Sequence, residues 1–361
     1  MGLSFAAFAG APVPAPESGP HEPEHQSANV GSFAFENGEV IDDFIVSYVT
    51  HGRLNEAQDN IILAMQSFAA DHHSLDFLIG PGKALDTDKY FIIATDFISN
   101  AFLRQDLTTG PTNSSLRMNF PLLTVGDWVN LEHQFVTEYL GFDRIYAAVG
   151  ASVAGMKAYR MAISYPDFIE GGIVAIAGSP RTNPQTRMVL RNVMNNLASN
   201  ASWHGGNYED NPATGLAVAL MNMVPWWHSP AWFKQNMTTP EQYRDYEKFW
   251  RDIWTIHAPQ DARDVFYQLN VWANFNIGDT PGFDGDTAAA LAEVKVPTLI
   301  VAGEDDMLAG RDELMFAADT IPNAAYFQVD SPYGHLVCCG AHPEAVEIMN
   351  PTIADFLDGL R

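Results

Sequence analysis

The chain has 361 residues, of which 47% are hydrophobic, so it is long enough to bury one large core with a sizeable insertion. Its 44 acidic residues outnumber 19 basic ones, and the resulting net charge of −25 argues against nucleic acid and anionic membranes as partners. No apolar run reaches the roughly 18 to 20 residues of a transmembrane helix, so we expect a soluble protein, either cytoplasmic or secreted.

The first thirty residues differ in character from the rest. Residues 3–11 are apolar, and a proline-rich, acidic stretch follows over 12–24 without a basic segment ahead of it. We interpret residues 1–30 as a disordered leader or the remnant of a signal peptide.

Short runs rich in β-branched and aromatic residues then alternate with helical patterns. This alternation is typical of βαβ units and predicts an α/β fold with a mainly parallel sheet. Helices are expected over residues 125–140, 153–164 and 343–357. Strands are expected over residues 44–50, 60–66, 90–95, 144–149, 172–176, 298–302 and 325–329.

The strand pattern stops between residues 181 and 285. Helical segments dominate there, and seven of the eight tryptophans lie between Trp203 and Trp272. Helices inserted after a central strand lie above the carboxyl edge of such a sheet, where these folds bind ligands. We therefore predict a helical cap over residues 181–285 on a core formed by residues 31–180 and 286–361.

The only two cysteines are adjacent, Cys338 and Cys339. They can close no long loop, and their spacing does not fit a metal cluster. We interpret them as small, partly buried residues, and we predict neither a metal site nor a bound cofactor.

The strongest local motif is Gly150-Ala-Ser152-Val-Ala154-Gly155, between a predicted strand and a predicted helix. A nucleophile elbow needs a serine on a tight strand-to-helix turn with small residues on either side. Gly150 and Ala154 meet this need, although the usual pattern has glycine where Ala154 stands. We predict that Ser152 is a catalytic nucleophile.

A nucleophilic serine needs an acid and a histidine later in the chain. The strand over 298–302 leads into a loop with Glu304, Asp305 and Asp306, any of which could be the acid. The next strand leads to Gly334 and His335, which is placed as the general base. His72 and His73 are rivals, but both precede the serine.

The tetrahedral intermediate of acyl transfer needs two backbone N–H donors for its oxyanion. Val153, directly after the serine, supplies the first. The second is expected from the loop after the strand over 60–66, with Phe68 as the preferred donor.

From residue 33 to residue 357 the chain resembles the homoserine O-acetyltransferase family of α/β-hydrolases. The resemblance rests on LIGPGKALD at 78–86, VGASVAGM at 149–156, WHGGNY at 203–208, DARD at 261–264 and SPYGH at 331–335. It implies that Ser152 is the nucleophile, His335 the base and Asp306 the acid, and that Phe68 lies in the oxyanion loop.

Two departures from the family bear on the substrate. The family's aspartate after the catalytic histidine is Leu336 here, and its substrate-gripping arginine aligns with Met194, with Arg191 one turn away. Without partners for the charged ends of an amino acid, homoserine should bind poorly. The chain is therefore more similar to the hydrolase-like branch of the family.

The sequence thus predicts a serine hydrolase that cleaves a largely apolar small-molecule ester, with an acetyl or other short-chain acyl group, through an acyl-enzyme. The alternative is an O-acyltransferase that uses acetyl-CoA and an alcohol other than homoserine. The sequence leaves the oligomeric state open, although proteins of this fold often form homodimers.

Overall fold

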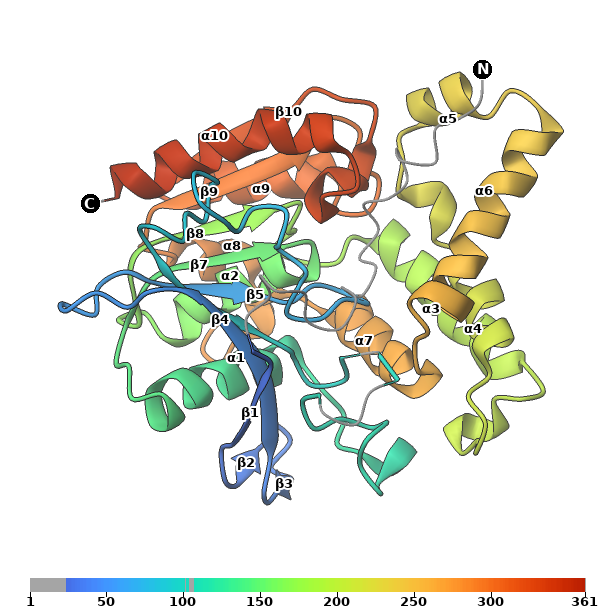
Figure 1. Cartoon of the computed structure of the whole chain (residues 1–361), viewed down its shortest axis with the longest axis horizontal. Coiled ribbons are helices and arrows are strands. Elements are labelled where there is room, and N and C mark those ends of the chain that lie inside the picture. The colour runs from blue at the N-terminus through green and yellow to red at the C-terminus, as the bar shows by residue number, and fades with distance from the viewer. Residues whose placement is uncertain (1–23, 101, 104–106, 361) are drawn as a thin grey trace.

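The computed structural model describes residues 24–100, 102–103 and 107–360. Its centre is an eight-stranded sheet with the strand order β1-β4-β6-β5-β7-β8-β9-β10 (Figure 1). A separate pair, β2-β3, lies at the N-terminal side. The strands are β1 Gln26–Asn29, β2 Phe33–Ala34, β3 Val40–Ile41, β4 Ile45–Gly52, β5 Ile61–Met65, β6 Phe91–Thr95, β7 Ile145–Ala151, β8 Ile169–Ile176, β9 Thr298–Gly303 and β10 Ala324–Val329.

The sheet is parallel from β6 through β10, whereas β1 and β4 run antiparallel at one edge. Every residue of β5, β7 and β9 is buried, and all three strands read as nearly continuous apolar runs. Strands covered on both faces require such runs. The seven predicted strands are all present, and the predicted mainly parallel α/β architecture is confirmed.

The helices flank the sheet and fill the long connection between β8 and β9 (Figure 1). The predicted helices at 125, 153 and 343 begin at those residues, and the first ends as a π-helical turn at Phe135–Tyr139. The helices are α1 Val125–Gln134, α2 Val153–Ser164, α3 Pro184–Ser199, α4 Ala213–Leu220, α5 Pro230–Asn236, α6 Pro240–Asp252, α7 Ala262–Asn274, α8 Thr287–Ala292, α9 Arg311–Thr320 and α10 Pro343–Gly359.

The predicted leader over residues 1–30 is wrong at its C-terminal end. Gln26–Asn29 forms β1, which pairs antiparallel with β4 and buries Ala28 completely. The polar sequence QSAN has no strand pattern of its own, because its order comes from backbone hydrogen bonds to an edge strand. Residues 1–23 lie outside the described part of the chain.

Residues 181–285 contain α3 to α7 and contribute no strand to the eight-stranded sheet. In Figure 1, α3, α4, α5 and α6 form a group at the right, away from the C-terminus. The division of the chain into a core and a cap stays a prediction. Within the described residues, no helix combines the length and apolar character needed to cross a membrane.

Candidate active site

Ser152 occupies a strained turn between β7 and α2. Its φ of +54° is left-handed, and its N–H donates to the Ile176 carbonyl oxygen at 2.7 Å. A Cβ atom on Gly150 would lie 2.3 Å from the carbonyl oxygen of Ala154, so glycine is required at position 150. A Cβ on Gly155 would lie 2.8 Å from the Cα of Gly178, which explains why this glycine follows Ala154. The turn thus has the local geometry of the predicted nucleophile elbow.

His335 reaches this serine from the other end of the chain. It lies in a short 3₁₀ helix, Gly334–Cys339, that follows β10, and its Nε2 is 2.8 Å from the Ser152 Oγ. Gly334 has a φ of +58°, and a Cβ there would lie 2.9 Å from the Ser229 backbone nitrogen. Only glycine therefore lets the chain turn His335 toward the serine.

Asp306 completes a chain of three hydrogen-bonded side chains. Its Oδ2 is 2.8 Å from the His335 Nδ1, and its Oδ1 accepts the N–H groups of Leu308 and Ala309, each at 2.9 Å. Asp306 is buried, whereas Glu304 and Asp305 are exposed. Among the three carboxylates of this loop, the structure brings Asp306 to the histidine.

The surroundings of His335 act on its pKa in opposite directions. Burial lowers the pKa of the imidazole, while the charge and the hydrogen bond of Asp306 raise it. The net result is a pKa above the ordinary value of 6.5. A histidine that is fixed in one orientation and strengthened as a base is what activation of a serine hydroxyl requires.

Phe68 lies in the loop after β5 and lines the same pocket as Ser152. Within the described part of the chain, its N–H has no hydrogen-bond partner. Both backbone polar groups of the next residue, Ala69, are hydrogen-bonded: Gln268 Oε1 accepts from the Ala69 N–H at 2.8 Å, and Gln260 Nε2 donates to the Ala69 carbonyl at 3.1 Å. Val153 is the first residue of α2.

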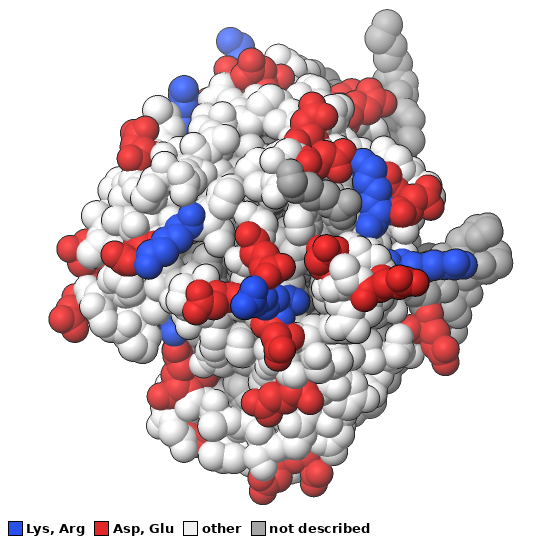
Figure 2. Space-filling model, turned by 90° about the vertical axis from the view of Figure 1, so that its left-hand side faces the viewer, with Lys and Arg blue, Asp and Glu red and all other residues white. Residues whose placement is uncertain are grey.

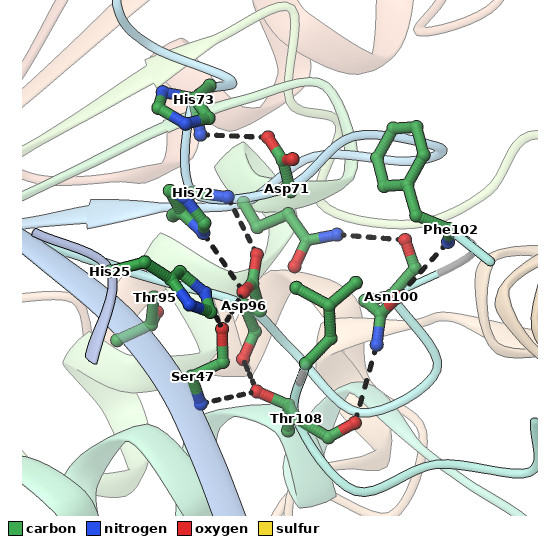
Figure 3. A network of polar contacts seen from close by, with 12 residues as sticks. His25, Ser47, Asp71, His72, His73, Thr95, Asp96, Asn100, Phe102 and Thr108 are labelled. Atoms are coloured by element: carbon green, nitrogen blue, oxygen red, sulfur yellow. Dashed lines mark hydrogen bonds and ion pairs between the residues drawn. The ribbon is translucent and has the colours of Figure 1, made fainter. Parts of the chain in front are cut away.

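His72, a rival for the general base in the sequence, belongs to a separate buried network (Figure 3). Its Nδ1 lies 3.0 Å from Asp96 Oδ2, and its backbone N–H donates to Asp96 Oδ1 at 2.7 Å. Ser47 also donates to Asp96 and is 2.8 Å from His25 Nε2. This network fixes the end of the β5 loop to the end of β6. The other rival, His73, pairs with Asp76 at 2.8 Å.

The same network contains the described group that comes closest to a metal site. One ligand atom from each of His25, His72 and Asp96 lies within 4.8 Å of the others. Their hydrogen bonds to each other and to Ser47 already account for these atoms. We therefore interpret the group as structural, and none of its residues lines the pocket at Ser152.

The pocket above Ser152 is small, with a cavity volume of about 80 Å³. No Asp, Glu, Lys or Arg among the described residues lines it. Gln260 is buried in the wall, and its Oε1 has no hydrogen-bond partner within the described residues. The lining residues are Ser67, Phe68, Ala69, Ser152, Met223, Trp227, Trp250, Ile253, Trp254, Gln260, Trp272, His335, Leu336 and Cys339.

The two departures from the acetyltransferase pattern differ in their position. Leu336, which replaces an aspartate, lines the pocket directly. Met194 is buried on α3, and Arg191 is exposed on the same helix; neither lines the pocket. The structure thus offers no cationic side chain to a substrate carboxylate at this site, within the residues that it describes.

Sequence reasoning missed the two glutamines that hydrogen-bond to Ala69 in the predicted oxyanion loop and the individual tryptophans that line the pocket. The clustering of seven tryptophans between positions 203 and 272 indicated a packed aromatic segment. It could not indicate that Trp227, Trp250, Trp254 and Trp272 would face Ser152. Nothing in the local sequence marks Gln260 and Gln268 as partners of a loop almost 200 residues away.

Known enzymes are similar to this chain over most of its length. A homoserine O-acetyltransferase from Carboxydothermus hydrogenoformans is 28% identical, over 93% of this chain and 95% of that protein. An ethyl acetate hydrolase from Pseudomonas veronii is 24% identical, over 91% of this chain and 94% of that protein. These relatives confirm the resemblance to homoserine O-acetyltransferases.

A solved structure of an acetylester hydrolase from Corynebacterium glutamicum superimposes with a TM-score of 0.84 at 22% identity, covering 93% of this chain and 96% of that one. The family model of the alpha/beta hydrolase fold matches residues 68–339, which is most of the chain. The protein is therefore an enzyme that belongs to the alpha/beta hydrolase fold family.

Proposed function

We propose that this protein is a serine esterase that hydrolyses small, largely apolar esters through an acyl-enzyme intermediate. The observation that carries the proposal is the continuous path from Ser152 Oγ through His335 to Asp306, with 2.8 Å at each step. The serine end of this path faces an apolar pocket without a charged clamp among the described residues.

In the first half of the reaction, Ser152 Oγ attacks the ester carbonyl while His335 Nε2 takes the hydroxyl proton. Asp306 orients the imidazole and stabilises its positive charge. The carbonyl oxygen becomes an oxyanion, for which the N–H groups of Phe68 and Val153 are the donors. His335 then returns the proton to the leaving alcohol, and the acyl group remains on Ser152.

In the second half, water takes the place of the alcohol. His335 removes a proton from the water, which attacks the acyl-enzyme and releases the acid. No cofactor enters either half.

The pocket lining supports a neutral, apolar substrate. Four tryptophans, Phe68 and Leu336 surround the serine, and such a surface favours burial of hydrocarbon. A substrate with a buried carboxylate or ammonium group would lose its hydration without a partner, which is costly. The named activities of two similar proteins, an ethyl acetate hydrolase and an acetylester hydrolase, support a short acyl group.

The second candidate is an O-acyltransferase in which an alcohol replaces water in the second half of the reaction. The homoserine O-acetyltransferases among the relatives favour it, with acetyl-CoA as the acyl donor. The absence of a carboxylate clamp among the pocket residues disfavours homoserine as the acceptor. Incubation with acetyl-CoA, with and without candidate alcohols, separates the two reactions: a transferase releases CoA only when an alcohol is present.

The test of the proposed function is Ser152→Ala, assayed with p-nitrophenyl acetate and with a fluorophosphonate probe. We expect a loss of activity of at least about 10³-fold together with loss of labelling, because the nucleophile is gone. Ser199→Ala, which alters an exposed serine at the end of α3, is the matched control and should keep both esterase activity and labelling by the probe. Wild-type turnover by Ser152→Ala would refute the proposal.

A further inference from the structure

The two cysteines of the chain occur at a position that their sequence context did not reveal. Cys338 and Cys339 are the last two residues of the 3₁₀ helix Gly334–Cys339, which also carries His335. They are the only cysteines present. Any chemistry between their sulfur atoms therefore takes place on the element that positions the proposed general base.

The two sulfur atoms are close together and differ in exposure. The Sγ–Sγ distance is 2.8 Å, and both thiols are free. Cys338 is completely buried, whereas Cys339 is half-buried and lines the pocket with Ser152 and His335. A small reagent that enters the pocket thus meets Cys339 first and finds Cys338 directly behind it.

The environment also assigns different roles to the two thiols. The hydrogen bond from Cys338 lowers the pKa of the Cys339 thiol, burial raises it and nearby His335 lowers it, so that its net pKa is below the ordinary value. Burial raises the pKa of Cys338. Cys339 is the better nucleophile because the thiolate is the reactive form of cysteine.

We propose that Cys338 and Cys339 form an oxidation-sensitive dithiol site in the pocket wall, which a hydroperoxide closes to a vicinal disulfide that inactivates the enzyme. The site itself is independent of the reaction at Ser152. The loss of activity rests on the proposed esterase function.

The step is balanced with one equivalent of hydroperoxide. The Cys339 thiolate attacks the peroxide oxygen, the O–O bond breaks, and a sulfenic acid forms as water or an alcohol leaves. Cys338 sulfur then attacks the sulfenic sulfur, the S–O bond breaks, and the hydroxyl leaves with the Cys338 proton as water. Two thiols are oxidised to one disulfide, and the peroxide is reduced.

The disulfide would distort the helix that carries it. The Cα atoms of disulfide-bonded cysteines are usually about 4.4–6.8 Å apart, whereas adjacent Cα atoms across a trans peptide are about 3.8 Å apart. The peptide between the cysteines must therefore leave its helical geometry. Just beyond it, Gly340 has a φ of +66°, and a Cβ there would lie 2.6 Å from the ring of Phe77, so this end has little room to move. The distortion is directed toward His335.

The consequence for the site follows from its geometry. A shift of His335 lengthens its 2.8 Å contacts with Ser152 and Asp306, on which proton transfer depends. The strain in a vicinal ring also makes the bond easy to reduce. Oxidation is thus expected to lower activity reversibly.

The experiment treats the full-length reduced protein with hydrogen peroxide and follows three quantities. Thiols titrated in denaturant should fall from two per chain to none. The proteolytic peptide that contains Cys338 and Cys339 should lose two hydrogen atoms while the protein remains a monomer on a non-reducing gel. Hydrolysis of p-nitrophenyl acetate should fall at least about tenfold and return with dithiothreitol.

Cys338→Ala is the matched control, because it removes the buried thiol and leaves the pocket-lining Cys339 in place. Its Cys339 should gain oxygen atoms under peroxide, and activity lost in this way should not return with dithiothreitol once the sulfinic acid forms. Two titratable thiols after treatment, or a wild-type peptide that gains oxygen like the variant's, would overturn the dithiol site whatever the activity shows. A disulfide that forms without loss of activity would overturn the inactivation alone. Loss of activity in Ser152→Ala tests the esterase function separately.

Discussion

At the scale of single residues, position in the fold decides which of several similar side chains has a role. Asp306 and Asp305 are neighbours with the same chemistry, yet one carboxylate is buried against His335 and the other is exposed. Two backbone N–H groups fix the Asp306 carboxylate and leave its second oxygen for the imidazole. Because this carboxylate is fixed, it holds the imidazole of His335 in one orientation.

The pH dependence of the wild-type enzyme tests this arrangement. His335 must be neutral to act as a base, so kcat/KM rises as pH increases through its pKa. Because the net pKa is raised by Asp306 against the effect of burial, the rise should be centred above pH 6.5.

In Asp306→Asn, the carboxylate charge that raises the pKa of His335 is gone while burial still lowers it, so the rise should move to lower pH and kcat should fall by roughly 10⁴-fold. Asp305→Asn changes the exposed neighbour and should alter neither the pH at which the rise is centred nor kcat. A pH–rate profile of Asp306→Asn that keeps the wild-type midpoint would contradict the assignment of Asp306.

At the scale of elements, α7 connects the long helical segment to the loop after β5. Gln268 on this helix is almost fully buried, accepts from the Ala69 N–H and donates to the Ser99 carbonyl. The position of the Phe68 N–H therefore depends on a helix that begins about 190 residues later. Buried polar pairs of this kind fix a loop in one conformation when all their partners are satisfied.

Substitution of Gln268 should therefore affect chemistry more than binding. In Gln268→Leu, two buried backbone groups lose their partners, and the loop that holds the proposed oxyanion donor is free to shift. We expect kcat to fall by about 10²-fold with little change in KM. The interaction that is weakened, between the Phe68 N–H and the oxyanion, is made only in the transition state.

Gln268→Glu can still accept from the Ala69 N–H and should recover part of the loss. Asn274→Ala, which removes an exposed amide from the end of the same helix, should behave as the wild type. A rise in KM alone would show that Gln268 shapes the binding pocket instead of the oxyanion loop.

At the scale of the whole molecule, the chain carries a large excess of acidic residues, 44 against 19 basic ones. On the face shown in Figure 2, acidic side chains are scattered and basic ones are fewer, without a single large patch of one sign. A net charge of −25 gives a compact protein substantial self-repulsion. Among the described residues, no acidic side chain lines the pocket at Ser152.

Salt should consequently stabilise the protein. Raising sodium chloride from low concentration to about 0.3 M shortens the screening length to about 6 Å and weakens repulsion between surface carboxylates. We expect Tm to increase by a few degrees in differential scanning fluorimetry. Potassium chloride at the same ionic strength is the control and should give the same increase. A Tm that is unchanged or lower in both salts would show that self-repulsion does not limit stability.

The sequence by itself predicted the architecture, which the structure confirms, and it named Ser152 and His335 as candidate catalytic residues. Buried parallel strands need nearly continuous apolar runs, and the elbow at Ser152 needs small residues at fixed spacing, so both leave local patterns. His335 was predicted because it follows a recognisable strand, whereas the strand before the acidic loop left Glu304, Asp305 and Asp306 open, and the resemblance to the homoserine O-acetyltransferase family favoured Asp306. These features can be predicted from short segments of the chain.

Only the tertiary structure decided what depends on contacts between distant segments. The β1 strand has no pattern of its own because it is ordered by backbone bonds to β4. Three further features could not be predicted from the sequence. They are the hydrogen bond between Gln268 and Ala69, the tryptophans that face Ser152, and the 2.8 Å distance between the sulfur atoms of Cys338 and Cys339 beside the pocket. Each results from packing between elements, and packing depends on three-dimensional placement that no local pattern encodes.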